Sequence, residues 1–408
     1  MTERKPIYLQ VVGAARPVSA TAAAGWQLAA LPPLALYIHF PWCVRKCPYC
    51  DFNSHEARGG FDEAGYIAAL LTDLEHSLPL IWGRPIHTIF MGGGTPSLFS
   101  PEAMDSLLAG IRARVKLLPD AEITLEANPG TVEADKFRGY RAAGINRLSI
   151  GIQSFNAEHL QAIGRIHGAD EARRAAALAG EVFDTFNLDL MFALPGQTLA
   201  QALQDVETAL SFAPSHLSCY HLTLEPNTYF HRYPPSLPDD DTAADMHDAI
   251  EARLAQAGFE HYETSAYARS GHRARHNVNY WQFGDYLGIG AGAHGKLSFP
   301  DRIIRQQRYK QPAAYLKALA EGNAVQSEAA IAEQELPFEF MLNALRLAEG
   351  FATPLFAERT GLPLAVLEPQ LAEAARLGLI QRDAQHIAPS EAGRRYQNQL
   401  FHCFLQDD

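Results

Sequence analysis

Cysteine, basic charge and long hydrophobic runs are all scarce in this chain. Its 408 residues include five cysteines, and 34 Lys and Arg stand against 46 Asp and Glu, which gives a formal net charge of −12. So few cysteines argue against a disulfide-rich secreted scaffold. The acidic excess argues against a protein that binds nucleic acid through a general basic field. We therefore predict no nucleic-acid partner.

One stretch without Asp, Glu, Lys or Arg runs from Pro17 to Val44 and raises the question of a membrane span. Gly25, Pro32 and Pro33 interrupt it, so it does not predict a transmembrane helix. The segment Ile7–Ala15 is too short and too interrupted for a signal peptide. Closely spaced thiols without an export signal favour the reducing cytoplasm. We expect a peripheral membrane location only through partner proteins.

Three of the five cysteines, Cys43, Cys47 and Cys50, lie within eight residues, directly after an apolar run. Thiolates at these spacings suit three corners of an iron–sulfur cluster, whose fourth iron would remain open to a ligand that is not protein. The triplet alone leaves other interpretations open. Cys47 and Cys50 could form a redox-active dithiol, His39 or His55 could complete a zinc site, or the thiols could form a disulfide.

Short apolar runs alternate with amphipathic stretches up to about residue 230. The runs typical of strands are Leu36–Phe40, His87–Met91, Glu122–Ala127, Arg147–Ile152, Phe186–Phe192 and His216–Leu224. The stretches with helical periodicity between them are Tyr66–His76, Pro101–Val115, Lys136–Ala143, Glu171–Ala179 and Leu199–Phe212. This alternation predicts an α/β fold with a parallel sheet of βα units. Six such units suit an open, partial barrel or an open doubly wound sheet.

The rhythm changes after about residue 230. An acidic joint, a helix at Ala243–Ala257 and an aromatic, glycine-rich section come first. Helices are then predicted at Pro337–Leu347, Thr353–Thr360 and Leu364–Leu377, followed by a hairpin at Leu379–Ile387 and a closing helix. This order is typical of a winged helix. From residue 335 on, six Arg and no Lys face ten Asp and Glu, so structural packing is expected there and not DNA binding.

These patterns divide the chain into four parts. Residues 1–33 form an Ala/Pro-rich extension and residues 34–270 form the α/β core. Residues 271–334 are a connecting region, and residues 335–408 are the winged-helix-like domain.

Chemistry-bearing residues gather at the carboxyl ends of the predicted strands. The cysteines follow the first strand, Gly92-Gly93-Gly94-Thr95 follows the second, and Glu126 lies near the end of the third. Gln153 follows the fourth, and Asp189 lies in the fifth. Ligand sites of parallel α/β folds form at this edge. The glycine run is neither a Walker loop nor a dinucleotide fingerprint, but its bare backbone would let a ligand lie against it.

Together these residues resemble the radical S-adenosylmethionine (SAM) superfamily. Its hallmark is the C-x3-C-x2-C triplet with an aromatic residue before the last cysteine, here Tyr49. Within it, the chain resembles the oxygen-independent coproporphyrinogen III oxidase branch over nearly everything after residue 33. The shared motifs are Tyr37-Ile-His-Phe-Pro-Trp-Cys43, Glu126-Ala-Asn-Pro-Gly130, Gly151-Ile-Gln-Ser-Phe155, Leu188-Asp-Leu-Met191 and Leu194-Pro-Gly196. The resemblance implies a partial (β/α)6 radical-SAM barrel and a C-terminal α+β region that ends in the winged-helix-like domain.

The resemblance also implies cofactors and their ligands. Cys43, Cys47 and Cys50 would ligate a 4Fe-4S cluster, with the amino and carboxylate groups of SAM on the fourth iron. The residues implied for SAM are Gly93, Gly94, Thr95, Glu126, Gln153, Arg165 and Asp189, with Tyr37 and Tyr49 near the cluster. An electron donor would reduce the cluster, and that electron would cleave SAM to methionine and a 5′-deoxyadenosyl radical.

Two features resemble the HemW-type heme chaperones more than the coproporphyrinogen dehydrogenases. The dehydrogenases carry a fourth cysteine two residues after the third, where this chain has Phe52. His276-Asn-Val-Asn-Tyr-Trp281 matches the H-N-x-x-Y-W motif of the heme-binding subgroup, which makes His276 a candidate heme residue. His294 and Cys219 are expected to be structural.

The resemblance therefore implies a chaperone that binds heme and passes it to acceptor hemoproteins, expected to be membrane-associated respiratory enzymes. It implies no coproporphyrinogen oxidase activity. The alternative is an enzyme, the oxygen-independent oxidase that converts coproporphyrinogen III to protoporphyrinogen IX.

Overall fold

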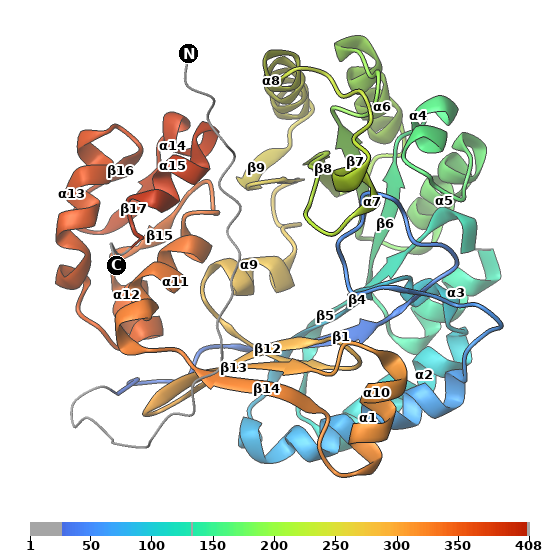
Figure 1. Cartoon of the computed structure of the whole chain (residues 1–408), viewed down its shortest axis with the longest axis horizontal. Helices are drawn as coiled ribbons and strands as arrows, with labels where there is room; N and C mark the ends of the chain where they lie inside the picture. The colour runs from blue at the N-terminus through green and yellow to red at the C-terminus, as the bar shows by residue number, and fades with distance from the viewer. Residues whose placement is uncertain (1–26, 132–133, 406–408) are drawn as a thin grey trace.

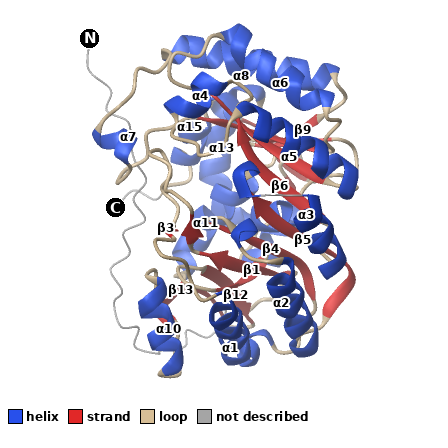
Figure 2. Ribbon diagram, turned by 90° about the vertical axis from the view of Figure 1, so that its right-hand side faces the viewer, coloured by secondary structure: helices blue, strands red, loops and turns tan. Residues whose placement is uncertain are grey.

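A sheet of twelve strands forms the body of the protein (Figures 1 and 2), as seen in a computed structural model that describes residues 27–131 and 134–405. At its centre, six parallel strands lie side by side in chain order. They are β1 (Leu34–Phe40), β4 (Ile86–Gly93), β5 (Leu117–Ala127), β6 (Arg147–Gln153), β7 (Phe186–Phe192) and β8 (His216–His221). The predicted parallel α/β core is confirmed. The signal-peptide question and most of the predicted extension, residues 1–26, lie outside the described residues.

Helices return the chain between these strands and cover the outer face of the sheet (Figure 2). They are α1 (Glu63–Ile81), α2 (Pro101–Arg114), α3 (Ala134–Ala143), α4 (Ala157–Ala162), α5 (Ala169–Val182), α6 (Leu199–Ser211) and α8 (Asp240–Gln256). Helix α2 begins where the sequence supplies both start signals, since Ser100 Oγ accepts from the Ala103 amide and Pro101 stands at the first position. Such local signals help to explain why helices of this kind can be predicted from the sequence.

Strand alternation separates an apolar outer face from a polar inner face. On β6, Leu148, Ile150 and Ile152 are fully buried in the main hydrophobic core. The residues between them, from Arg147 to Gln153, line a cavity on the other face. Because successive side chains of a strand point to opposite faces, one strand both packs against helices and supplies polar groups to the interior.

Six further strands, which were not predicted from the sequence, extend the sheet at both edges. On the β1 side lie β11 (Asp285–Ile289), β12 (His294–Phe299), β13 (Arg302–Arg308) and β14 (Val325–Ala330), and beyond β8 lie β10 (Ala266–Ala268) and β9 (Glu260–Glu263). The segment predicted as a connecting region therefore supplies four strands. Strand β11 runs parallel to β1, while β12 to β14 are antiparallel to their neighbours.

Buried ion pairs fix this extension against the core. Asp285, at the start of β11, is fully buried between Arg84 at 2.9 Å and Lys296 at 3.0 Å. Arg308 at the end of β13 meets Asp73 of α1 at 3.0 Å, and both side chains are buried. Such pairs fix the position of the added strands relative to the core, because separating the partners would leave an unpaired charge in the interior.

A separate C-terminal unit has its own apolar core around Phe340, Phe351 and Phe356. Its elements are α11 (Leu336–Ala344), β15 (Phe351–Ala352), α12 (Thr353–Thr360), α13 (Glu368–Arg376), β16 (Ile380–Arg382), β17 (His386–Pro389), α14 (Glu391–Arg395) and α15 (Gln397–His402). The predicted order of three helices, a hairpin and a closing helix is present, except that two short helices, α14 and α15, stand in place of the single closing helix.

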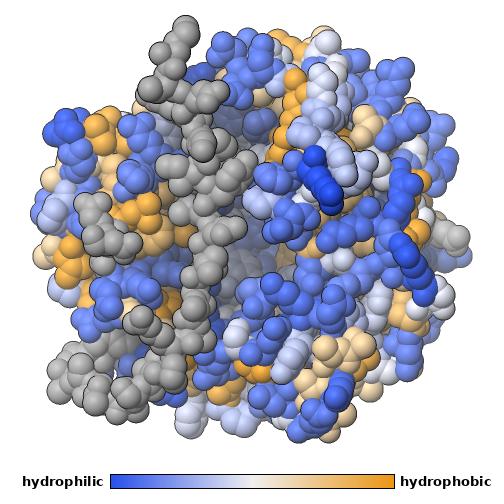
Figure 3. All heavy atoms as spheres, viewed as in Figure 1, coloured by the Kyte–Doolittle hydropathy of each residue, from blue (hydrophilic) through white to orange (hydrophobic). Residues whose placement is uncertain are grey.

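The remaining elements are short. They are β2 (Trp42–Cys43), β3 (His55–Glu56), α7 (Tyr229–Arg232), α9 (Arg275–Trp281) and α10 (Pro312–Ala320). No helix in the described part of the chain has both the length and the apolar character needed to cross a bilayer. On the face drawn in Figure 3, apolar residues lie in separate patches among hydrophilic ones.

Candidate functional site

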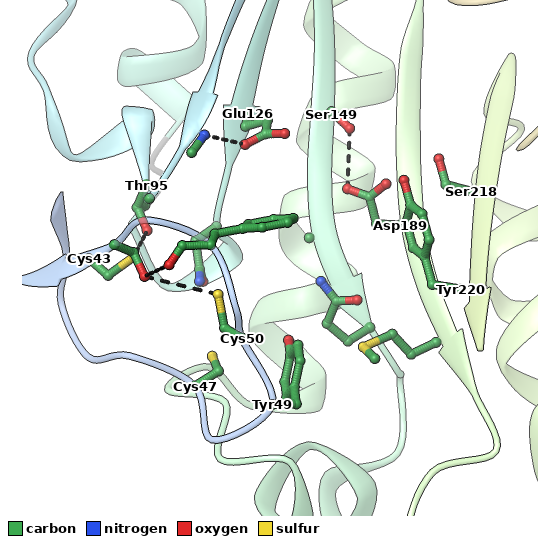
Figure 4. A pocket seen from close by; sticks show the side chains of 18 of the residues that line it. Cys43, Cys47, Tyr49, Cys50, Thr95, Glu126, Ser149, Asp189, Ser218 and Tyr220 are labelled. Carbon is green, nitrogen blue, oxygen red and sulfur yellow. Dashed lines mark hydrogen bonds between the residues drawn. The ribbon is translucent and has the colours of Figure 1, made fainter. Parts of the chain in front are cut away.

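A cavity of about 460 Å³ lies inside the curve of the parallel strands. The three clustered cysteines line one end of it, and inward-facing residues of β5 to β8 line the opposite side (Figure 4). The predicted convergence of functional residues at the carboxyl ends of the strands is therefore present.

The cysteine loop is tied to the sheet by backbone pairing. Cys43 lies in β2, which pairs with β3 on the far side of the loop and so closes it around Cys47 and Cys50. The Thr95 hydroxyl donates to Cys43 Sγ at 3.4 Å, and Arg165 Nη1 lies 3.7 Å from Cys47 Sγ. Donors on these sulfurs stabilise the thiolate form, which is the form that ligates iron. Burial raises the pKa of the free Cys43 and Cys50 thiols, so metal must displace their protons.

The donor set fits an iron–sulfur cluster better than a disulfide or a zinc site. All five cysteines are free thiols, which removes the disulfide. Among the described residues, no three His, Cys, Asp or Glu side chains surround a point as ligands of a single metal ion. His39 bonds Tyr37 and the Asn53 carbonyl, and His55 bonds the Lys310 carbonyl, so neither imidazole completes a zinc site. Three thiols at one end of a cavity suit a cluster with one sulfur on each of three irons.

The glycine run after β4 brings bare backbone beside the cysteine loop. Gly93 has φ of 109°, and a Cβ there would lie 2.4 Å from the His39 ring. A Cβ on Gly94 would lie 2.6 Å from the Trp42 carbonyl oxygen. The amides of Gly94 and Thr95 donate to the carbonyls of Phe40 and Trp42, at 2.7 Å each. Glycine is therefore required for the close approach of two loops.

Two carboxyl groups face the cavity from neighbouring parts of the sheet. Glu126 accepts from the Gly93 amide at 3.1 Å, and Asp189 accepts from Ser149 and Asn187 at 3.2 and 2.7 Å. Burial, with a smaller effect of Asp189, raises the pKa of Glu126 to about 8. Burial also raises the pKa of Asp189. Two acids in one cavity suit a ligand that carries positive charge and hydroxyl donors, because such a ligand stabilises their ionised forms.

Arg165 joins the cysteine loop to β6. Its guanidinium donates to the Gly151 carbonyl at 2.5 Å and to the Tyr49 hydroxyl at 3.5 Å. Gln153, whose φ is 69°, lines the same cavity. With the exception of Tyr37, every residue predicted for the cluster or SAM lines this one cavity. Tyr37 lies behind the lining, where its hydroxyl bonds His39 at 2.9 Å.

His276 lies on α9, next to the cavity but not in its lining. Its side chain is buried, its Nδ1 bonds Thr88 Oγ1 at 2.9 Å, and its ring stacks on Phe90 at 5.0 Å. Burial lowers the pKa of His276 to about 3, so the imidazole is neutral, the form that ligates iron. Its Nε2 has no hydrogen-bond partner among the described residues. The heme role of His276 stays a prediction.

Several residues that line the cavity were not predicted from the sequence. They are Arg147, Ser149, Asn187, His216, Ser218 and Tyr220. A signal for them existed, since they occupy alternate positions of the predicted strands on the face that also carries Gln153 and Asp189.

Comparison with known proteins agrees with this geometry. Residues 37–209 match the family model described as Radical SAM superfamily, and residues 331–396 match the HemN C-terminal domain. The fold is similar to that of coproporphyrinogen III oxidase (HemN) from Escherichia coli, with a TM-score of 0.79 and 24% identity over 92% of this chain and 90% of that one. Fold and cysteine site together define a radical SAM protein.

Nearly full-length relatives narrow the family. The chain is 50% identical over 379 residues to heme chaperone HemW of Escherichia coli K12, covering 92% of this chain and 99% of that protein. It is 47% identical over 384 residues to heme chaperone HemW of Haemophilus influenzae, covering 93% and 99%. The chain belongs to the HemW family. Membership in the radical SAM superfamily implies a 4Fe-4S cluster and SAM as cofactors.

Proposed function

We propose that this protein is a heme chaperone that binds heme and transfers it to acceptor hemoproteins. The observation that carries the proposal is the 50% identity to a heme chaperone over 99% of that relative's length. We expect the acceptors to be respiratory hemoproteins, reached in the cytoplasm or at the membrane surface through partner contacts. We also propose that the chain is divided into its four parts at residues 34, 271 and 335.

Within this function, Cys43, Cys47 and Cys50 would hold the cluster, and SAM would occupy the cavity beside it. The cluster would supply one-electron chemistry when bound. The protein's own part would be to bind and orient the ligand. Gly93 and Gly94 would place bare backbone against it, Arg165 would meet its carboxylate, and the carboxyls of Glu126 and Asp189 would take its ammonium and hydroxyl donors.

For heme, His276 would be a residue of the binding region, with its free Nε2 as the candidate iron ligand. Because α9 buries this side chain, heme binding would require α9 to move away from Phe90. His276 to Ala should then abolish stoichiometric heme binding. His272 to Ala, four residues earlier and outside the cavity lining, is the matched control.

The alternative is the coproporphyrinogen oxidase activity, which the fold of HemN keeps open. The position of Phe52 speaks against it. Phe52 lines the cavity beside Cys50, is 59% exposed, and stands where the dehydrogenases carry a fourth cysteine. Its ring offers no ligand or proton donor at this point.

The deciding experiment uses protein whose cluster has been reconstituted under anaerobic conditions. We expect difference spectra to show about one heme bound per chain, and chromatography of incubations with SAM, a reductant and coproporphyrinogen III to show no decarboxylated product. Conversion to protoporphyrinogen IX would overturn the chaperone proposal in favour of the oxidase.

A further inference from the structure

Three buried polar atoms, one in the lining of the cavity and two beside it, have no hydrogen-bond partner in the described part of the chain. They are Thr124 Oγ1, Arg147 Nε and His276 Nε2. Thr124 and Arg147 are paired in register on β5 and β6, so their side chains share the inner face of the sheet. Buried polar groups in native proteins are almost always bonded, so three orphans near one another need an explanation.

Of these three residues, Arg147 gives the strongest indication of a ligand site. Its side chain is only 3% exposed, yet it lines the cavity. Among the described residues, its guanidinium has neither a hydrogen-bond partner nor a carboxylate within ion-pair distance. A buried cation without a partner is costly, and a structural arginine in this position would be paired.

The neighbouring polar groups are committed elsewhere. Asp189 accepts from Ser149 and Asn187, and His216 bonds Asn187 and Tyr262. Glu122 accepts the first amides of α9, those of Arg275 and His276, at 3.1 Å each. Among the described residues no carboxylate pairs directly with Arg147, although Asp189 interacts with its charge at longer range, and the cavity is the open direction.

We propose that Arg147, flanked by the Thr124 hydroxyl, forms a subsite for one carboxylate group of a ligand at the floor of the cavity. A guanidinium presents parallel N–H donors that match the two oxygens of a carboxylate. A dianion such as phosphate fits less well, because the carboxylate of Asp189 lines the same cavity and repels two negative charges more strongly than one.

The carboxylate has two possible sources, which the experiment separates. One is a propionate side chain of heme, and this version rests on the proposed function. The other is a small free carboxylic acid, and this version does not depend on heme binding. Both require the same Arg147 guanidinium.

The test compares wild-type protein with Arg147→Met, Arg147→Lys and Thr124→Val, each with its cluster reconstituted. Arg112→Met is the control, since that arginine donates to the Ala143 carbonyl and does not line the cavity. Titrations use heme and heme dimethyl ester, and thermal melts compare sodium acetate with sodium chloride at equal ionic strength.

If the source is a propionate, Arg147→Met weakens heme binding about 10- to 100-fold, the range for one lost charge-assisted hydrogen-bonded pair. Wild type and variant then bind the dimethyl ester equally, Arg147→Lys is intermediate, and Thr124→Val loses a few-fold. If the source is a free acid, acetate raises the melting temperature of wild type but not of Arg147→Met, and heme affinity is unchanged.

Two outcomes would overturn the subsite. The first is a wild-type response in Arg147→Met to both heme and acetate. The second is a melting temperature of ligand-free Arg147→Met that falls by several degrees with both responses retained, because that result identifies a structural arginine. A wild-type protein that binds no heme refutes the proposed function, while the acetate comparison still decides the subsite.

Discussion

Replacing Glu126 with Gln should change how the stability of the ligand-free protein depends on pH. The Glu126 carboxyl faces the cavity, and burial raises its pKa from 4.5 to about 8. Between these two values the folded protein keeps a proton that the unfolded chain has lost. Stability of the wild type therefore falls as pH rises through this window, and it is level above pH 8.

The loss of stability can be calculated from the difference between the pKa values of Glu126 in the unfolded and the folded protein. Each pH unit between the two pKa values removes about 1.4 kcal/mol, so the full interval would remove about 5 kcal/mol. Water in the cavity screens the carboxylate, and we expect about 2–3 kcal/mol. For a chain of 408 residues that corresponds to about 2–4 °C in melting temperature.

The measurement is the melting temperature of wild type and Glu126→Gln at intervals from pH 5 to pH 9. The variant cannot titrate at this position, so its advantage over wild type should grow from pH 5 to pH 8 and then level off. Glu181→Gln, at an exposed position of α5, is the control and should stay parallel to wild type. Parallel curves for wild type and Glu126→Gln across the range would refute the raised pKa.

Three further predictions concern the cluster loop and the core. Changing any one of Cys43, Cys47 or Cys50 to Ala should abolish the iron–sulfur absorption after anaerobic reconstitution, while Cys219→Ala retains it; full spectra in all three variants would contradict the site. Gly94→Ala should weaken SAM binding at least about 10-fold in calorimetry, because its Cβ would meet the Trp42 carbonyl at 2.6 Å. Gly168→Ala, with 3.8 Å of clearance, should bind SAM normally. Arg308→Met should lower the free energy of unfolding in urea by about 3–5 kcal/mol, since it leaves Asp73 buried without its cation. Arg382→Met, which removes the exposed Arg382–Glu368 pair, should lower the free energy of unfolding by less than about 1 kcal/mol. Equal decreases in Arg308→Met and Arg382→Met would refute the distinction between the buried and the exposed ion pair.

Much of the architecture was predictable because its signals are local. The apolar runs identified all six central strands, and helical periodicity identified most of the helices between them. The cysteine spacing and the glycine run are also local, so the cysteines proposed for the cluster could be named from the chain alone, and the family resemblance added the residues proposed for SAM.

The sheet extension could not be predicted in this way. The sequence of strand β13 is Arg302-Ile-Ile-Arg-Gln-Gln-Arg308, and it is too polar to predict a strand. Its place depends on Arg308 meeting Asp73, 235 residues away, and on Asp285 meeting Arg84 and Lys296. Pairs of such separation leave no pattern in a short window of sequence.

The sequence by itself determined the βα rhythm, the winged-helix-like end and the three thiols, because periodicity and spacing are properties of neighbouring residues. Only the tertiary structure decided which inward-facing residues meet. The tertiary structure pairs Thr124 with Arg147 across two strands and packs His276 of α9 against Thr88 of β4. It also leaves Arg147 Nε without a hydrogen-bond partner among the described residues. Register between strands sets these contacts, and register is a relation between distant segments that neither segment encodes alone.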